Sequence, residues 1–475
     1  MKNKASTLKR FLTFILLFFF ACQLLSSCQK DSFITSESAL LITSADTLKF
    51  DTVFTSIGSV TQTFKINNLN NQKLLLQQVK LMGGSSSPFS LNINGTANSL
   101  LNNIEIAAND SIYVFVTAKI NPNSAPLPFI VKDSIGIVYN GNSKFIQLEG
   151  YGQNANFLRN RNISGNITWP NNLPYVILGS LTINAGSSLT IEAGCKIYSH
   201  ANAPFLVNGT LVTYGTQALP IIFNGDRIDG NYKDLPAAWL GIYFTGTSSD
   251  NNMTHTIIKN ALQAVVAEQP SINTKPKLTL HQCIIDNAMD VGLMSINSSI
   301  SADNSLITNC GNNLRLTYGG VYNFTNCTLV SFSTSFIGHT KPVLIINNSF
   351  INGTSVQTSA LTANFTNCII WGDGSLVDNE ITIDKQGTDS FNVLLDHCLY
   401  KANTDPANSI ISQCIKNQMP LFDNIDYAKQ IFNFKTNNSL APGVDKGLNG
   451  TGFAKDLNDN NRTVNITDIG CYEKQ

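Results

Sequence analysis

The sequence predicts an all-β protein in which an antiparallel β-sandwich is followed by a right-handed parallel β-helix. Three observations lead to this fold class. Only 13% of the 475 residues are charged. Low charge with abundant Asn, Ser and Thr suits stacked β structure with neutral polar turns better than helical bundles. Residues 41–153 alternate between short apolar-polar runs and polar turns. One pattern then recurs at a spacing near 22 residues in the C-terminal half.

Residues 1–27 have the layout of a secretory signal peptide. A basic head precedes an apolar core at residues 11–20, and the run Leu25-Ser26-Ser27-Cys28 follows. This run resembles a bacterial lipobox, in which a small residue precedes a cysteine that receives lipid. The resemblance implies that the mature chain begins at Cys28 and is anchored to a membrane by acyl chains. The alternative is an uncleaved signal-anchor helix, but the apolar stretch is shorter than the roughly 20 residues that a spanning helix needs.

Residues 28–40 are predicted to be a linker between the lipid and the first folded domain. Its beginning, Gln29-Lys30-Asp31, resembles the export signal that sends Bacteroidota-type lipoproteins across the outer membrane, and the alternative is a chance polar linker. The resemblance implies a lipid-anchored protein of the outer membrane that faces the exterior. The membrane is therefore the first expected partner.

The charge of the exported part argues against nucleic acid as a partner. The first 27 residues hold four of the 31 basic residues and no acidic one, so 27 basic residues remain against 31 acidic ones. The sequence has no basic tail or stripe of the kind that nucleic-acid-binding proteins use.

Residues 41–153 are predicted to form the β-sandwich. Strand-like runs occupy residues 47–50, 63–66, 74–81 and 111–116, and the turn Asn140-Gly141-Asn142 joins two more in a hairpin. Several such strands over roughly 110 residues are typical of a sandwich. The order of the runs also resembles the abnormal-spindle/hydin-type immunoglobulin-like module. That resemblance implies an immunoglobulin-like spacer or binding unit.

Residues 160–473 are predicted to form the β-helix, because seven segments share one pattern. Each segment has a small anchor residue with Asn, Gln or His directly before it and an apolar residue three positions before it. The anchors are separated by 27, 22, 22, 22, 19 and 30 residues, and they are Thr256, Cys283, Ser305, Cys327, Ser349, Cys368 and Cys398.

The pattern has a physical explanation in a bent strand. Side chains of a strand alternate between two faces, and here the apolar phase slips by one residue just before the anchor. A slip indicates a bend, and Asn adopts left-handed backbone more readily than other non-glycine residues. We therefore expect the residues before the anchors to form a ladder whose amides bond coil to coil. The anchors themselves would form an inward stack of small side chains.

Motifs at both ends of this region resemble a known β-helix family. The opening run "GSLTINAGSSLTIEAGCKIYSHANAPFLVNGTL" looks like the first coils of extracellular β-helix proteins. The later runs "NCIIWGD", "SLAPGVDKG", "DLNDNNR" and "DIGCYE" together resemble the choice-of-anchor-Q type, which is related in architecture to polysaccharide lyases. The resemblance implies the fold and says little about the activity.

The cysteines are not predicted to bind metal. Cys283, Cys327, Cys368 and Cys398 follow the coil spacing, and Ser and Thr replace Cys at other positions of the same column. A ligand pair would instead be expected at Cys-x-x-Cys spacing. We expect a buried stack of small side chains, since a free Cys packs like a small hydrophobe.

Two acid-bearing loops are the candidate ligand-binding sites, because insertions in solenoids often form the binding face. Acids could serve as catalytic groups there, and Trp rings could stack on sugars. The alternative is that the loops are solvated turns and the Trp rings pack in the core. The candidates are Asp226, Arg227, Asp229, Asp234 and Trp239 in the first loop, and Trp371, Asp373 and Asp384 in the second.

Three functional hypotheses follow. The first is a surface lipoprotein without enzymatic activity, whose β-helix binds a glycan or a protein. The second is a polysaccharide lyase or glycoside hydrolase acting on acidic polysaccharide, in which a base removes a proton and Ca²⁺ could stabilise the resulting charge. The third is a structural envelope component. Apart from that Ca²⁺, no cofactor is expected.

Overall fold

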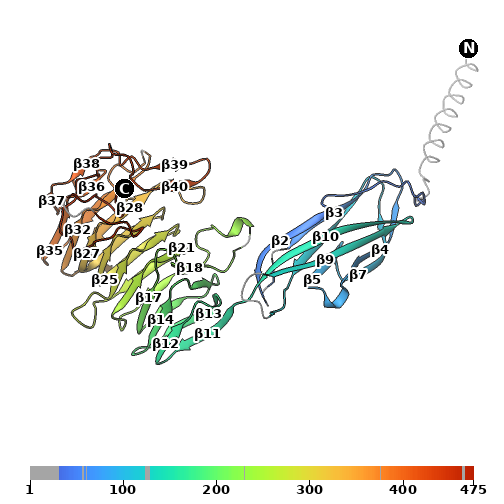
Figure 1. The fold of residues 1–475 in the computed structure, drawn as a ribbon, viewed down its shortest axis with the longest axis horizontal. Helices are drawn as coiled ribbons and strands as arrows, with labels where there is room; N and C mark the ends of the chain where they lie inside the picture. The colour runs from blue at the N-terminus through green and yellow to red at the C-terminus, as the bar shows by residue number, and fades with distance from the viewer. Residues whose placement is uncertain are drawn as a thin grey trace, which may run out of the picture. The chain divides into compact units, whose positions relative to one another are not determined.

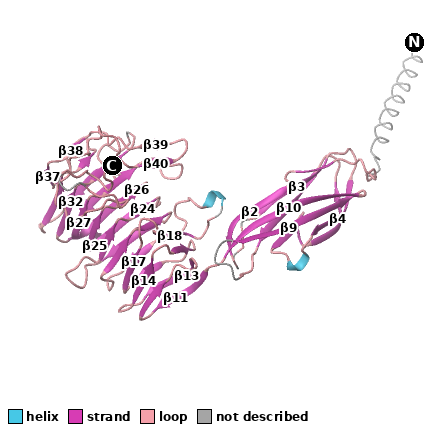
Figure 2. Ribbon diagram, viewed as in Figure 1, coloured by secondary structure: helices cyan, strands magenta, loops and turns pink. Residues whose placement is uncertain are grey.

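The computed structural model describes residues 32–55, 58–59, 61–123, 129–228, 230–374, 376–462 and 466–475. The predicted signal peptide, the lipidation site Cys28 and the first residues of the linker lie outside these ranges. The chain divides into two compact units, with the boundary between Gln153 and Asn154. Strands dominate both units (Figures 1 and 2).

The first unit is a sandwich of two five-stranded sheets that enclose an apolar core. One sheet has the order β1 (Leu41–Thr43), β3 (Gln62–Asn68), β8 (Ser111–Ala118), β5 (Phe89–Ile93) and β6 (Thr96–Ala97). The other has the order β2 (Thr47–Phe54), β10 (Asn142–Gln153), β9 (Phe129–Tyr139), β4 (Leu74–Leu81) and β7 (Leu100–Ile106). A short 3₁₀ turn, η2, covers Gly84–Ser86.

The predicted hairpin in this unit is confirmed. Tyr139 pairs with Asn142 in the β9–β10 ladder, so Asn140 and Gly141 form a two-residue turn. Both have positive φ, at 45° and 77°. These angles match the type I′ turn, whose twist agrees with that of the flanking strands.

The second unit is a parallel β-helix built on a 26-stranded sheet. Its strands are β11 (Asn156–Ile163), β12 (Asn166–Trp169), β13 (Tyr175–Ile183), β14 (Ser188–Glu192), β15 (Lys196–Ser199), β16 (Phe205–Val207), β17 (Thr210–Tyr214), β18 (Ile221–Gly225), β19 (Ile242–Phe244), β20 (Asn251–Thr254), β21 (Thr256–Lys259), β22 (Gln263–Glu268), β23 (Leu278–His281), β24 (Ile284–Asp286), β25 (Val291–Asp303), β26 (Leu306–Thr308), β27 (Leu314–Thr325), β28 (Thr328–Ser331), β29 (Leu344–Asn347), β32 (Leu361–Thr366), β33 (Ile369–Gly372), β34 (Ile381–Asp384), β35 (Phe391–Asp396), β36 (Leu399–Tyr400), β37 (Ile410–Ser412) and β38 (Ile415–Lys416). Two antiparallel hairpins form separate two-stranded sheets. They are β30 (Ser349–Asn352) with β31 (Ser355–Thr358), and β39 (Asn424–Asp426) with β40 (Ile431–Asn433).

Each coil contributes strands to three parallel ladders. The first ladder includes β17, β20 and β23, the second includes β18, β21, β24, β26 and β28, and the third includes β16, β19 and β22. Alternate side chains of all three point into one apolar core that runs through the coils. The predicted fold class, a sandwich followed by a β-helix, is thereby confirmed.

The predicted bend column is confirmed at six of its seven positions. The residue before the anchor has left-handed backbone there, with φ between 40° and 54°, and the anchor after it is buried. The bend residues are His255, Gln282, Asn304, Asn326, Asn367 and His397.

The prediction for the seventh position was wrong, since Asn348, the residue before Ser349, does not form a left-handed bend of this column. β29 runs directly into the β30–β31 hairpin, and the coil resumes at β32, which pairs with β27. Asn326 and Asn367 are therefore successive bends 41 residues apart. The gap of 22 residues between Cys327 and Ser349 therefore matches the coil spacing only by coincidence, because Ser349 belongs to the inserted hairpin.

The amides of the column bond to a different partner from the one we expected. Asn367 donates to the Asn326 side chain at 2.9 Å, which is a coil-to-coil bond. The other side chains of the column mostly bond to the C-terminal segment, residues 439–475. Asn304 accepts from the Arg462 guanidinium at 2.9 Å, and Gln282 donates to Asp459 at 2.7 Å. The column therefore serves as a docking strip for the end of the chain.

The C-terminal segment covers the outer face of the second ladder. Outward side chains of that ladder, such as Val330 and Ile369, pack with Phe434, Leu457 and Ile469 in a second, smaller core. A buried ion pair between Arg462 and Glu473, at 3.0 Å, lies at the same place. This ladder is thus covered on both faces over part of its length.

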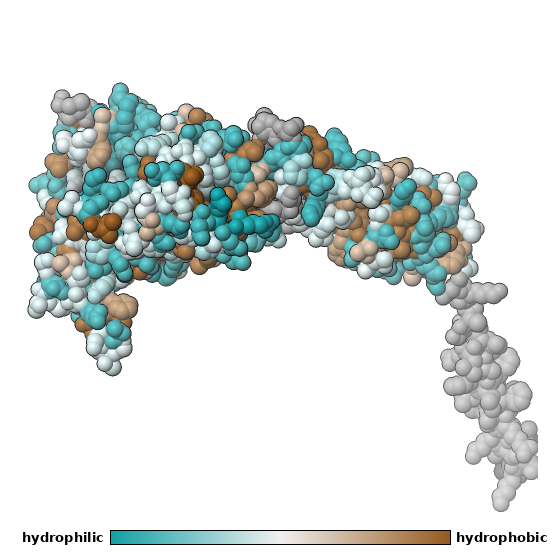
Figure 3. All heavy atoms as spheres, turned by 90° about the horizontal axis from the view of Figure 1, so that it is seen from below, coloured by the Kyte–Doolittle hydropathy of each residue, from teal (hydrophilic) through white to brown (hydrophobic). Residues whose placement is uncertain are grey.

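No helix among the described residues is long and apolar enough to cross a membrane. On the face drawn in Figure 3, hydrophobic residues form small scattered groups among hydrophilic ones.

Candidate functional site

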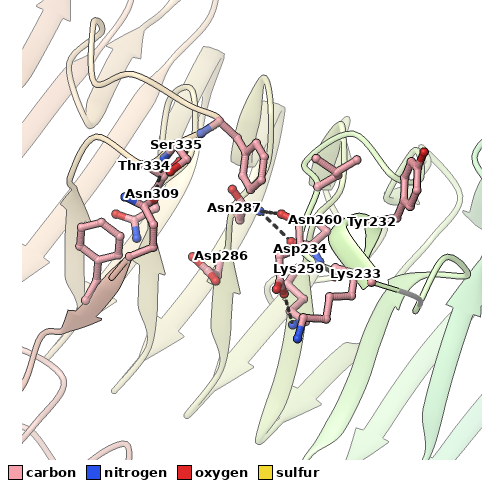
Figure 4. A pocket seen from close by; sticks show the side chains of 15 residues that line it. Tyr232, Lys233, Asp234, Lys259, Asn260, Asp286, Asn287, Asn309, Thr334 and Ser335 are labelled. Atoms are coloured by element: carbon pink, nitrogen blue, oxygen red, sulfur yellow. Dashed lines mark hydrogen bonds and ion pairs between the residues drawn. The ribbon is translucent and has the colours of Figure 1, made fainter. Parts of the chain in front are cut away.

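A groove of about 880 Å³ lies beside the second ladder of the β-helix. One wall is the loop between β18 and β19, which contains the short 3₁₀ turn η3 (Gly230–Tyr232). The opposite wall combines the loop at Thr334–Phe336 with the β39–β40 hairpin. Its floor is formed by the C-terminal ends of β21, β24 and β26, and we name it the bend groove (Figure 4).

The floor carries a second column of left-handed Asn residues. Asn260, Asn287 and Asn309 follow β21, β24 and β26, with φ of 62°, 57° and 51°. Here the amides do bond from coil to coil. Asn287 donates to the Asn260 oxygen at 2.8 Å, and Asn260 donates to Asn224 at 2.9 Å. These bonds hold the coils of Asn224, Asn260 and Asn287 in register.

The amide chain stops at Asn287, inside the groove. The Asn287 side chain is only 9% exposed, and its Oδ1 has no hydrogen-bond partner in the part of the chain that the structure describes. Figure 4 shows the bonds of this side chain running only toward the η3 wall. A buried acceptor without a donor is costly, and this oxygen is closed off from solvent beneath the surface of the floor.

The same Asn column fixes the η3 wall. Asn260 donates to the Lys233 carbonyl and Asn287 to the Asp234 carbonyl, both at 2.8 Å. The indole of Trp239, at the other end of this loop, donates to the Lys259 carbonyl at 2.9 Å. The loop is therefore held in place before any ligand arrives.

Asp373 fixes the opposite wall. Its carboxylate accepts from the Ser333 backbone at 2.9 Å and from the Tyr427 hydroxyl at 2.9 Å. Burial and the Asp373 carboxylate both raise the pKa of Tyr427, so the hydroxyl keeps its proton and donates. Asp373 thus joins the Ser333 loop to the segment that leads into β40.

A carboxylate without a side-chain partner lies on the floor. Asp286 ends β24 and points outward, since its neighbour Ile285 faces the core. Among the described residues, it has a hydrogen bond from the Asn287 backbone N–H and no ion pair. Lys259 is its register partner on β21, but the Lys259 ammonium pairs with Asp234 at 3.6 Å. Burial raises the pKa of Asp286 to about 6, against the opposing effect of Lys259.

Aromatic rings stand at the rim. Tyr232 and Phe336 line opposite walls and are 44% and 48% exposed. Phe432, on the same wall as Phe336, is partly buried. The Arg227 guanidinium lies 4.0 Å from the centre of the Tyr232 ring, where a cation–π contact orients it. The groove thus combines acceptors on its floor with aromatic faces at its edge.

The structure brings only part of the predicted first loop to the groove. Asp234 lines it and pairs with Lys259. Asp226 does not line it, since its carboxylate is bonded to the His200 ring at 2.7 Å. Asp229 lies outside the described residues. The enzymatic hypothesis requires the acids of this loop to lie together, and the two described ones, Asp226 and Asp234, do not.

The remaining predicted residues have structural positions. Trp239 is fully buried beside Phe223, and Trp371 is 9% exposed in the smaller core, so neither ring is available to stack on a ligand. Asp384 is exposed and bonded to Gln386, away from the groove lining. Of the second loop, only Asp373 contributes, and it acts by holding a wall.

Sequence reasoning missed Asp286 and the second Asn column. The signal was present, since Asn260, Asn287 and Asn309 each lie four residues after an anchor and keep the anchors' spacing. Asp286 lies three residues after its anchor, at the outward position next to the bend. A search of every column of the repeat, and not only of the insertions, would have found both.

Within the described ranges, no group of three or more His, Cys, Asp or Glu side chains is arranged to hold a metal ion. The eight cysteines there are free thiols, and seven of them are buried.

Comparison with protein-family models and with curated protein sequences gives no match. Among solved structures, a family 123 glycoside hydrolase from Clostridium perfringens is 13% identical over 24% of this chain and 25% of its own, with a TM-score of 0.17. A PapD-like domain of human CEP192 is 8% identical over 27% of this chain and 94% of its own, with a TM-score of 0.18. This chain thus spans about a quarter of the hydrolase. Scores this low assign neither a fold nor a function.

Replacing Asp286 with Asn should stabilise the protein at neutral pH. The folded-state pKa of about 6 exceeds the ordinary 3.8, so the folded state favours the protonated carboxyl and the buried charge is unfavourable above pH 6. A shift of about two pH units corresponds to roughly 3 kcal/mol at most. We expect Asp286→Asn to raise the free energy of unfolding at pH 7 and to change nothing near pH 3.8. Urea denaturation at both pH values measures this.

The matched control is Asp384→Asn, which removes an exposed carboxylate and should be neutral at both pH values. An Asp286→Asn variant that is less stable than the wild type at pH 7 would show that the carboxylate has a favourable partner.

Proposed function

We propose that the protein is an exported, lipid-anchored protein of the cell envelope that binds a glycan in the bend groove. The lipobox-like run ending at Cys28 supports anchoring and export. The groove supports glycan binding, and its volume falls within the range of small-molecule sites. In this proposal, the sandwich separates the β-helix from the membrane.

The observation that carries the binding proposal is the combination, in one groove, of the Asp286 carboxylate on the floor and exposed aromatic rings at the rim. Sugars present many hydroxyl donors, which suit the Asp286 carboxylate. Their C–H faces pack on aromatic rings such as Tyr232 and Phe336. Both walls are already fixed by hydrogen bonds, so binding would require little ordering of the protein.

The enzymatic alternative is favoured by one property of the groove. A carboxyl with a pKa of about 6 can exchange protons near neutral pH, as a general acid or base must. Depolymerisation of pectin, alginate or a glycosaminoglycan by the wild type, abolished by Asp286→Ala, would establish this alternative.

The binding proposal predicts that the rim aromatics contribute to affinity. We expect a glycan array of neutral, acidic and amino-bearing oligosaccharides, probed with detergent-purified protein, to give at least one ligand class. Phe336→Ala should weaken binding of that ligand about tenfold or more, because truncating an aromatic anchor commonly has effects of this size. Isothermal calorimetry measures the change.

The control is Phe350→Ala, since Phe350 is similarly exposed at 50% but lies on the β30–β31 hairpin, outside the groove lining. Equal effects of the two substitutions, or no ligand on the array, would contradict the proposal.

The anchoring proposal predicts that Cys28 carries the lipid. A Cys28→Ala variant should fail to incorporate radiolabelled palmitate and should leave the membrane fraction. Metabolic labelling and cell fractionation test this, with Cys22→Ala as the matched control. Continued acylation of Cys28→Ala would refute the lipid site.

A further inference from the structure

We infer that the bend groove selects glycans that carry a free primary ammonium group, with Asp286 as the partner of that ammonium. This inference rests on the proposed glycan binding and specifies its ligand class. It differs from the acidic polysaccharide that the sequence suggested for the enzymatic hypothesis.

The groove floor offers no side-chain donor to the Asp286 carboxylate. Among the described residues, only the Asn287 backbone N–H contributes a hydrogen bond to this carboxylate, and no Lys, Arg or His forms an ion pair with it. The Asn287 oxygen beside it also lacks a donor, but it is closed off from solvent, so Asp286 is the group that a ligand can reach. An ammonium group offers three donors and a positive charge, which suits such a carboxylate.

The cations that line the groove do not neutralise Asp286. Lys259 is the register partner of Asp286, but the Lys259 ammonium forms its ion pair with Asp234, which lies on the η3 wall. Lys233 lines the groove from the same exposed wall, and its carbonyl, not its ammonium, is the group held by Asn260. Thr308, the register partner of Asp286 on the next coil, carries no charge. The protein therefore leaves Asp286 without a close counter-ion.

The Asp286 carboxylate discriminates between acidic, neutral and amino sugars. A uronate would place a second carboxylate beside Asp286, and like charges at short range in a partly dehydrated site are strongly disfavoured. A neutral sugar would supply donors but leave the charge uncompensated. An amino sugar supplies both, while its ring packs on Tyr232 or Phe336 at the rim.

The protonation state of Asp286 should make the affinity for an amino sugar depend on pH. The ammonium needs the ionised carboxylate, so its affinity should fall as the pH drops below about 6, where Asp286 becomes protonated in the free protein. The titratable groups that interact with Asp286 are Lys259, Asp234 and Cys310, and none of these residue types has an ordinary pKa in that range.

Calorimetry with two matched oligosaccharides tests the inference. Chitosan oligosaccharide has free amines, and chitin oligosaccharide of the same length has each amine acetylated. We expect the wild type to bind the free-amine form at least tenfold more tightly at pH 6.5. Asp286→Asn should remove that preference by weakening the free-amine form only. Asp234→Asn should reduce the preference as well, because it releases Lys259 to pair with Asp286.

The control variant is Asp384→Asn, which should keep the wild-type preference. Equal affinity for the two oligosaccharides, or a preference unchanged by Asp286→Asn, would overturn the ammonium inference and leave glycan binding in place. Tighter binding of oligogalacturonide than of either probe would overturn it too. If no oligosaccharide on the array binds, both proposals fail.

Discussion

Left-handed bends at polar residues are the constraint on which this β-helix depends. A coil of three strands closes only if the chain turns sharply between them, and at two of the corners the turn falls on a non-glycine residue with positive φ. Asn tolerates that backbone better than most residues and also presents an amide at the corner. The stacking of coils then lines these amides up in columns. The core, the groove and the docked end of the chain all lie against such columns.

The two columns use their amides in different ways. At the first column, side chains such as Asn304 and Gln282 bond to the C-terminal segment, which covers the outer face of the second ladder. At the second column, Asn260 and Asn287 bond to each other and to the carbonyls of the η3 wall. One kind of corner therefore closes the coil, attaches the chain end and builds a groove wall. The groove arises where the second amide chain stops.

Much of the fold could be predicted from the sequence, because the repeat consists of residue types with strong preferences for a backbone conformation or for burial. The buried anchors and the polar bends are examples, and six of the seven predicted bend positions are confirmed. The failure at Ser349 has a simple cause, since an inserted hairpin can reproduce the coil spacing without belonging to the coil. Spacing alone does not separate the two.

The site was harder to predict, because its residues come together through register and through the returning chain. Asp286 is a single acid in an ordinary strand, and only the pairing of β21 with β24 places it beside Lys259. The wall around Phe336 depends on Asp373 and Tyr427, which are 54 residues apart. The acid-rich insertions were predicted as binding sites instead, and their two Trp rings are both buried.

The most direct test of the account is a crystal structure of the protein with a bound chitosan oligosaccharide. The account predicts a sugar ammonium within about 3 Å of the Asp286 carboxylate. A sugar bound elsewhere, or bound in the groove with its amine turned to solvent, would contradict it.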